Sequence, residues 1–174
     1  MRRLSLNARM MQDELVSDQI YVVLIEIDHP ELPRPIRLST DNADRIQAEP
    51  PIYGTRSSWR GANPITDPYL WIVASALLPG DQDDTPAAAT IALENLDREM
   101  VRLVRSFTAP ATVAMAVVLA STPDQVEAEW TNLRIVSADT DAGEVLLSIS
   151  REQIEMEYFP SGRMTRDRFP GLHL

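Results

Sequence analysis

The segment from Thr112 to Ile154 constrains the fold more than any other part of the chain. It contains three runs rich in β-branched and apolar residues, TVAMAVVLAS, VEAEWTNLRIVSAD and EVLLSISREQI, which are separated only by TPDQ and TDAGEV. Such runs favour strands, and connectors this short join antiparallel neighbours. The middle run alternates in character, with Val126, Ala128, Trp130 and Asn132 expected on one face. The segment therefore predicts a meander of three antiparallel strands.

Further strands are expected on both sides of a long irregular segment. Ile20–Asp28 (IYVVLIEID) is typical of a mostly buried strand, and a proline-rich turn separates it from a second strand at about Ile36–Ser39. Tyr69–Pro79 fits a strand or a buried helix, and its flanking prolines favour the strand. Ala88–Asp97 alternates well enough for another strand. Between these runs, residues 41–68 predict a long exposed loop with at most one short strand.

Two helices are predicted. Leu4–Leu15 has apolar residues near helical spacing, which indicates a short amphipathic N-terminal helix. At about 97–107, DREMVRLVRSF also has the helical period, and Asp97 is suited to cap it. Strands around one internal helix predict a mainly β fold of the α+β kind, a barrel or a sandwich, in a single domain spanning residues 1–174.

Composition excludes several classes of function. The 174 residues contain no cysteine, so disulfides, zinc-thiolate sites and cysteine nucleophiles are impossible. The net charge of -10 opposes binding to a phosphate backbone, and we expect no sequence-specific nucleic-acid partner. We also expect no membrane partner, because no run approaches the roughly 18 to 20 apolar residues of a membrane span. The N-terminal sequence has no apolar signal region, which predicts assembly in the cytoplasm.

Residues suited to catalysis are few. His29 and His173 are the only histidines, and both are expected to be ordinary surface residues. The acidic stretch GDQDDTP lacks the glycine and glutamate of a calcium loop. We therefore predict no catalytic residues, no metal and no cofactor. A pair of carboxylates that meets only in the fold stays open, because spacing cannot exclude it.

Two sequence features are typical of interaction surfaces. Arginine and aromatic residues gather in the long loop, where Trp59 and Arg60 lie near Tyr53 and Arg56. An equally good interpretation is that Trp59 folds this loop back onto its own core. The other feature is a C-terminal arm at 159–174, where arginines alternate with large apolar residues on an acidic protein. The candidate interface residues of the arm are Phe159, Arg163, Arg166, Arg168, Phe169 and Leu172.

Three stretches carry a resemblance to known proteins. They are VVLIEIDHPELPRPIRLSTD, ATIALENLDREMVRLVRSFTAPATVAMAVVLASTPDQVE and EYFPSGRMTRDRFPGLH. Together they resemble a family of tailed-phage minor tail or tail-assembly proteins of unassigned function, encoded near tape-measure and tail-tip hub genes. The middle stretch is also similar to the tube-like domains of distal tail proteins. Residues 41–79 carry the least similarity.

The resemblance implies a non-enzymatic structural subunit of a phage or prophage tail tip, with a tail-tube-like β-barrel fold. Its partners would be further copies in a ring, a hexamer or a trimer, and the neighbouring tail tube, tape measure and hub. The protein would then reside in the virion. Two alternatives stay open: a carboxylate-dependent hydrolase of cell-wall glycan, and a monomeric ligand-binding β-barrel.

Overall fold

The chain is mainly β. A computed structural model describes residues 5–77, 88–94, 110–140 and 144–151, together with Arg168 and Gly171. Within these ranges it contains one α-helix, α1 (Leu6–Asp13), a 3₁₀ turn, η1 (Trp59–Gly61), and a ten-stranded mixed sheet. The strands are β1 (Tyr21–Asp28), β2 (Ile36–Ser39), β3 (Asp44–Gln47), β4 (Ile52–Thr55), β5 (Tyr69–Trp71), β6 (Val73–Leu77), β7 (Ala88–Glu94), β8 (Thr112–Leu119), β9 (Thr122–Thr140) and β10 (Glu144–Arg151).

The strand order is β3-β4-β5-β2-β1-β8-β9-β10-β7-β6. All neighbouring pairs are antiparallel except β2 and β5, which are parallel. The predicted barrel is wrong in one respect, because the sheet has two ends, β3 and β6, and is not closed. The N–H of Ile72 donates to the carbonyl of Ser39 in β2, and beyond Ile72 the chain pairs with β7. Among the described residues no pairing joins β6 back to β5 or β2, so the sheet stays open.

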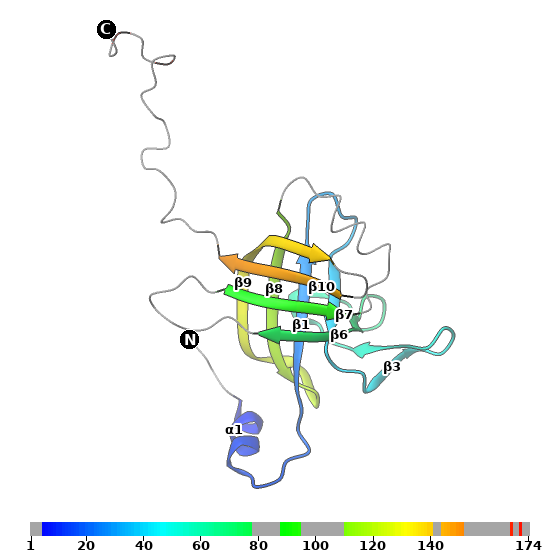
Figure 1. Ribbon diagram of the computed structural model, residues 1–174. Helices are drawn as coiled ribbons and strands as arrows, with labels where there is room; N and C mark the ends of the chain where they lie inside the picture. The colour runs from blue at the N-terminus through cyan, green and yellow to red at the C-terminus, as the bar shows by residue number, and fades with distance from the viewer. Residues whose placement is uncertain are drawn as a thin grey trace.

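The sheet folds over on itself to make two layers. Figure 1 shows β6, β7 and β10 lying across β1 and β8, and the long strand β9 passes from one layer to the other. The main core lies between the layers and takes side chains from both. Its most deeply buried members include Ile25, Ile91, Met115, Leu133, Leu147 and Ile149.

A bulge in β9 allows it to belong to both layers. Met115 of β8 pairs with Trp130, whereas Val113 pairs with Leu133, so β9 has one extra residue there. Asn132 adopts a left-handed backbone with φ of 58°. A bulge bends its strand and reverses which residues face inward. Leu133 is therefore buried and Asn132 exposed, so the prediction that Asn132 continues the face of Trp130 is wrong.

Several predicted elements are confirmed with small changes of boundary. α1 lies inside the predicted helix, and the side chain of Ser5 caps it by accepting the N–H of Ala8. The hairpin of β1 and β2 and the meander of β8, β9 and β10 are also as predicted. The helix predicted at 97–107 lies outside the described residues.

Three predictions of local structure need correction. The predicted connector TPDQ is already part of β9, because a tight turn at Ala120 and Ser121 suffices. The segment Tyr69–Pro79 contains two strands, since the chain changes partners at Ile72. The long loop at 41–68 contains two strands, β3 and β4, which form a hairpin that projects from the body (Figure 1).

Candidate functional site

Residues 56–68, here called the Trp59 loop, cover the outer face of the sheet beside β1 and β8. A second apolar cluster lies beneath this loop and is separate from the main core. The cluster consists of Val22, Leu24, Trp59, Ala62, Tyr69, Ala114, Ala116 and Val118. β1 is consequently buried on both faces. The alanines of β8 leave room for the indole of Trp59, which has only 8% of its surface exposed.

A buried ion network lies on the same face. Glu26 in β1 pairs directly with Arg37 in β2, and only 4% of Glu26 is exposed. Nε of Arg37 donates to Oε2 of Glu26 at 3.0 Å, while another nitrogen of Arg37 contacts Asp67. Nε of Arg60 donates to the second oxygen of Glu26. Two carboxylates thus balance two guanidinium groups, which is what burial of such charges requires.

The turn at Arg60 adopts a backbone that the ion network stabilises. Arg60 has a φ of 52° and Gly61 follows with 73°. A left-handed conformation costs a residue other than glycine about 1 kcal/mol. The hydrogen bond from Arg60 to Glu26 offsets this cost, and it also raises the pKa of the Arg60 guanidinium. The Trp59 loop therefore depends on an arginine at the turn as well as on its tryptophan.

Tyr69 joins the ion network to the aromatic cluster. Its hydroxyl donates to the carbonyl of Trp59 at 3.0 Å, and the two rings lie 5.8 Å apart. The guanidinium carbon of Arg37 lies 5.9 Å from the centroid of the Tyr69 ring, within cation–π range. Burial, followed by the charge of Glu26, raises the pKa of the Tyr69 hydroxyl. Tyr69 therefore remains a hydrogen-bond donor at any physiological pH.

The outer side of the Trp59 loop is bound to the start of β9. The backbone N–H and the hydroxyl of Ser58 both donate to Oδ1 of Asp124, at 2.6 and 2.9 Å. These bonds lower the pKa of the Asp124 carboxyl. Ser57 donates to the carbonyl of Pro123, and the indole N–H of Trp59 donates to Glu129 at 3.0 Å. The loop is therefore fixed at both its buried and its exposed sides.

The described carboxylates near the Trp59 loop are occupied by structural contacts. Glu26 and Asp67 bind arginines, Asp124 accepts from Ser58, and Glu129 accepts from Trp59. In the described ranges, no three histidine or acidic side chains gather in a way that could hold a metal ion. No helix among the described residues is both long and apolar enough to cross a membrane.

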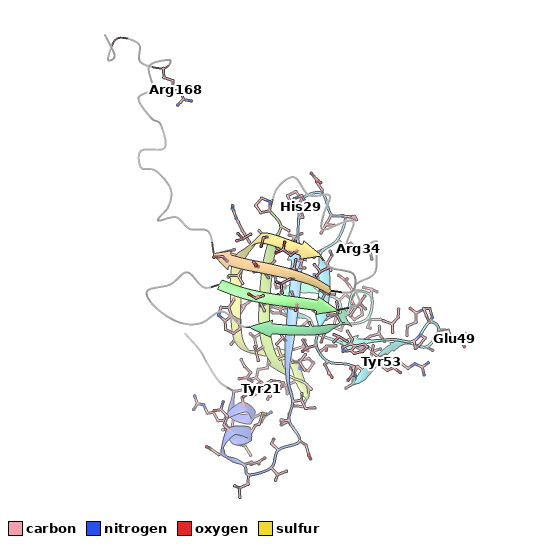
Figure 2. All side chains as sticks on the ribbon, in the orientation of Figure 1. Tyr21, His29, Arg34, Glu49, Tyr53 and Arg168 are labelled. Carbon is pink, nitrogen blue, oxygen red and sulfur yellow. The ribbon has the colours of Figure 1, made fainter. Side chains whose placement is uncertain are left out.

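The projecting hairpin of β3 and β4 is the second notable surface. Figure 2 shows Glu49 at its tip and Tyr53 along its side. Beside it, Leu70, Trp71 and Val73 are each between 38% and 45% exposed, as is Tyr53. Both end strands of the sheet, β3 and β6, also have an unpaired edge within the described part of the chain. An unpaired edge can form hydrogen bonds with a strand from another chain.

The predicted interface residues fall into three groups. Trp59 is buried within its own domain, and Arg60 is partly exposed above the ion network. Arg168 is described and exposed. The other five arm residues, Phe159, Arg163, Arg166, Phe169 and Leu172, lie outside the described residues. The structure therefore brings Trp59 and Arg60 together in the Trp59 loop.

Sequence reasoning missed Glu26, Arg37 and Asp67. The available signal was a charged residue in the middle of each of two apolar strands, IYVVLIEID and IRLS. Paired strands place such residues opposite each other when their register is known, and the register came only from the structure. His29 was expected at the surface but is 3% exposed, because the turn after β1 folds over it. Its Nδ1 accepts the N–H of Glu31.

Comparison with known proteins adds no relationship for this chain. A scan against models of protein families gives no match, and a search of curated proteins also gives no match.

Proposed function

We propose that this chain is a structural subunit of a phage or prophage tail tip. Copies of it would form a ring that connects the tail tube and tape measure to the distal hub. The proposal starts from the resemblance of the three quoted stretches to minor tail proteins. The mainly β fold is consistent with it, and a likeness to tail-tube domains is part of the proposal.

The observation that carries the proposal is an open sheet, whose two end strands have no further partner among the described residues, together with a projecting hairpin. β3 and β6 lie at opposite ends of the strand order, so they are different surfaces. A contact between two different surfaces is head-to-tail. Repeated head-to-tail contacts close into a ring when the rotation from one copy to the next divides a full turn evenly. The exposed apolar residues beside the hairpin, Leu70, Trp71 and Val73, provide area for such a contact.

The interior of the domain supports a structural role over ligand binding. The space between the two layers is filled by large side chains such as Met115, Trp130 and Leu147. The carboxylates around the Trp59 loop bind arginine, serine and tryptophan partners, an arrangement that stabilises a loop. The net charge of -10 would also repel DNA passing through a ring.

Electron microscopy and sedimentation test this function together. We expect the purified full chain to form rings of one stoichiometry as its concentration is raised, or when the tail protein encoded beside it is added. Antibodies against the chain should label the distal end of tail particles from the producing cell. Labelling of the cell wall combined with release of glycan fragments would instead support the hydrolase alternative.

A further inference from the structure

Among the described residues, exposed apolar side chains are most numerous in the N-terminal segment. The N-terminal surface is defined here as the exposed apolar residues between Ser5 and Tyr21. Its members are Leu6, Met10, Leu15, Val16, Ile20 and Tyr21, of which Leu15 and Val16 are 105% and 84% exposed. Apolar residues this close together on an exposed segment are typical of a binding surface.

The orientation of α1 is unusual for a helix packed on its own domain. An amphipathic helix normally turns its larger apolar residues inward. Here the buried residue is Ala8, whereas Leu6 and Met10, four positions apart on one face, point outward. Figure 1 shows α1 standing beyond the end of the sheet. The apolar face of α1 is therefore available to another molecule.

Specific bonds hold the N-terminal surface in this orientation. Before α1, the N–H of Ser5 donates to Oε2 of Glu127 at 2.7 Å. After it, the N–H of Ala120 donates to the carbonyl of Ile20, and Ser121 donates to Gln19. These bonds fix the segment to β9 and to the turn between β8 and β9.

Carboxylates lie among the apolar residues of the N-terminal surface. Between Ser5 and Tyr21 the sequence has Asp13, Glu14 and Asp18 against Arg9, while Arg2 and Arg3 precede this range. Glu127 beside Ser5 is 3% exposed, and its Oε1 has no hydrogen-bond partner in the described part of the chain. A half-satisfied buried carboxylate is stabilised by an incoming cationic donor, and a guanidinium provides the strongest pairing. The surface thus fits a segment that carries both arginines and large apolar residues.

The sequence 159–174 has this composition. Its side chains carry a net charge of +2, from three arginines and Asp167, while the protein as a whole is at -10. Phe159, Met164, Phe169 and Leu172 supply large apolar groups between the charges. We propose that the N-terminal surface of one copy binds the C-terminal segment 159–174 of a second copy. The ring of the proposed function supplies the setting for this contact, and the inference rests on that function.

Geometry favours a second copy over the same chain. β10 ends at Arg151, which pairs with Leu133, and Leu133 in turn pairs with Val113 at the start of β8. The N-terminal surface is attached at Ala120, seven residues further along, a distance of about 23 Å at 3.3 Å per residue. Residues 152–158 span at most about 25 Å when fully extended. Within one chain Phe159 could reach Ala120 only on an almost fully extended linker, whereas a second copy can place residues 159–174 on the surface without this constraint.

Disulfide trapping tests this contact, because the chain has no cysteine of its own. Leu15→Cys and Phe169→Cys are introduced into separate full-length copies, which are mixed in equal amounts and oxidised. We expect the mixed disulfide to form at least five-fold faster than one between Ile65→Cys and Phe169→Cys. Ile65 is the matched control, since it is 84% exposed and lies in the Trp59 loop.

Three outcomes would overturn the inference. One is that the disulfide between Leu15→Cys and Phe169→Cys forms no faster than the disulfide between Ile65→Cys and Phe169→Cys. Another is a Leu15→Cys homodimer as the main product, which would show that the N-terminal surfaces of two copies pair with each other. The third outcome comes from a single chain that carries both Leu15→Cys and Phe169→Cys. If the disulfide within that chain forms at high dilution as fast as the mixed disulfide forms between two copies, the segment docks in the same chain. Rapid mixed trapping without rings in the microscope would refute the ring but leave this contact in place.

Discussion

Glu26 is the residue on which the Trp59 loop depends most, because both of its oxygens bind arginines from different elements. We predict that Glu26→Met alone destabilises the protein by about 3 kcal/mol, since it removes the most buried carboxylate of the network and leaves the guanidinium of Arg37 with Asp67 alone. The double variant Glu26→Met, Arg37→Met should lose less than the two single losses combined, with a coupling free energy of about 2 kcal/mol. Urea unfolding of the four proteins gives this value. If the losses of the two single variants simply add in the double variant, the Glu26–Arg37 ion pair makes no separate contribution to the free energy of unfolding.

Asp124 gives a pH-dependent prediction. Its pKa is lowered in the folded state, so its carboxylate stabilises the fold above the ordinary value of 3.8, and this contribution disappears as the pH falls through the lowered pKa. Asp124→Asn should therefore melt below the wild-type protein at pH 7, and the difference should shrink as the pH falls below 3.8. Thermal melts across this range measure it. A difference that stays constant with pH would contradict the assignment of the effect to the charge of Asp124.

The Asp124 carboxylate lies at the protein surface, where pairs are weak, so the expected shift in melting temperature is a few degrees at most. Asp139 provides a matched control, because it is an exposed aspartate of the same strand. At pH 7, Asp139→Asn should lower the melting temperature less than Asp124→Asn does.

At the scale of elements, Gly54 determines whether the projecting hairpin stays attached to the sheet. A Cβ at this position would lie 2.0 Å from the carbonyl oxygen of Tyr69 in β5, which is a backbone atom that cannot move aside freely. We predict that Gly54→Ala separates β4 from β5 and costs about 3 kcal/mol, the upper end for overpacking. Hydrogen exchange should accelerate in β3, β4 and β5 before it does in β1 and β8.

Gly61 is the matched control for Gly54. A Cβ there meets nothing within 4 Å, but the residue has a φ of 73°. Gly61→Ala should cost only about 1 kcal/mol of backbone strain and leave exchange in the hairpin unchanged. Equal effects of the two substitutions would show that loss of glycine flexibility, and not the close approach of β4 to β5, explains the result.

The same elements show how far sequence could predict this fold. The strands with long apolar runs, β1 and β8, were predictable because their composition alone specifies them. β3 and β4 were missed because DRIQ and IYGT are short and lack a clear alternation. The sequence left open whether Trp59 lies at an interface or packs on its own core, and in the structure it packs on the core. The strand register pairs Glu26 with Arg37, and Glu26 also binds Arg60 of the Trp59 loop, which the sequence could not indicate.

At the scale of the whole molecule, the two core clusters make a prediction about the C-terminal arm. Both described clusters lie between Val22 and Ile149, so a chain that ends at Tyr158 keeps all of their members. A chain truncated after Tyr158 should therefore fold, with a melting temperature by circular dichroism within about 3 °C of the full chain. It should also lose self-association in sedimentation, because residues 159–174 supply the proposed contact with the next copy.

A full-length chain with Arg163, Arg166 and Arg168 all changed to Gln is the control that keeps the apolar residues. It should fold equally well and associate more weakly, with less dependence on salt. Unfolding of the truncated chain would instead show that the arm completes the core, and the assembly role of residues 159–174 would then be wrong.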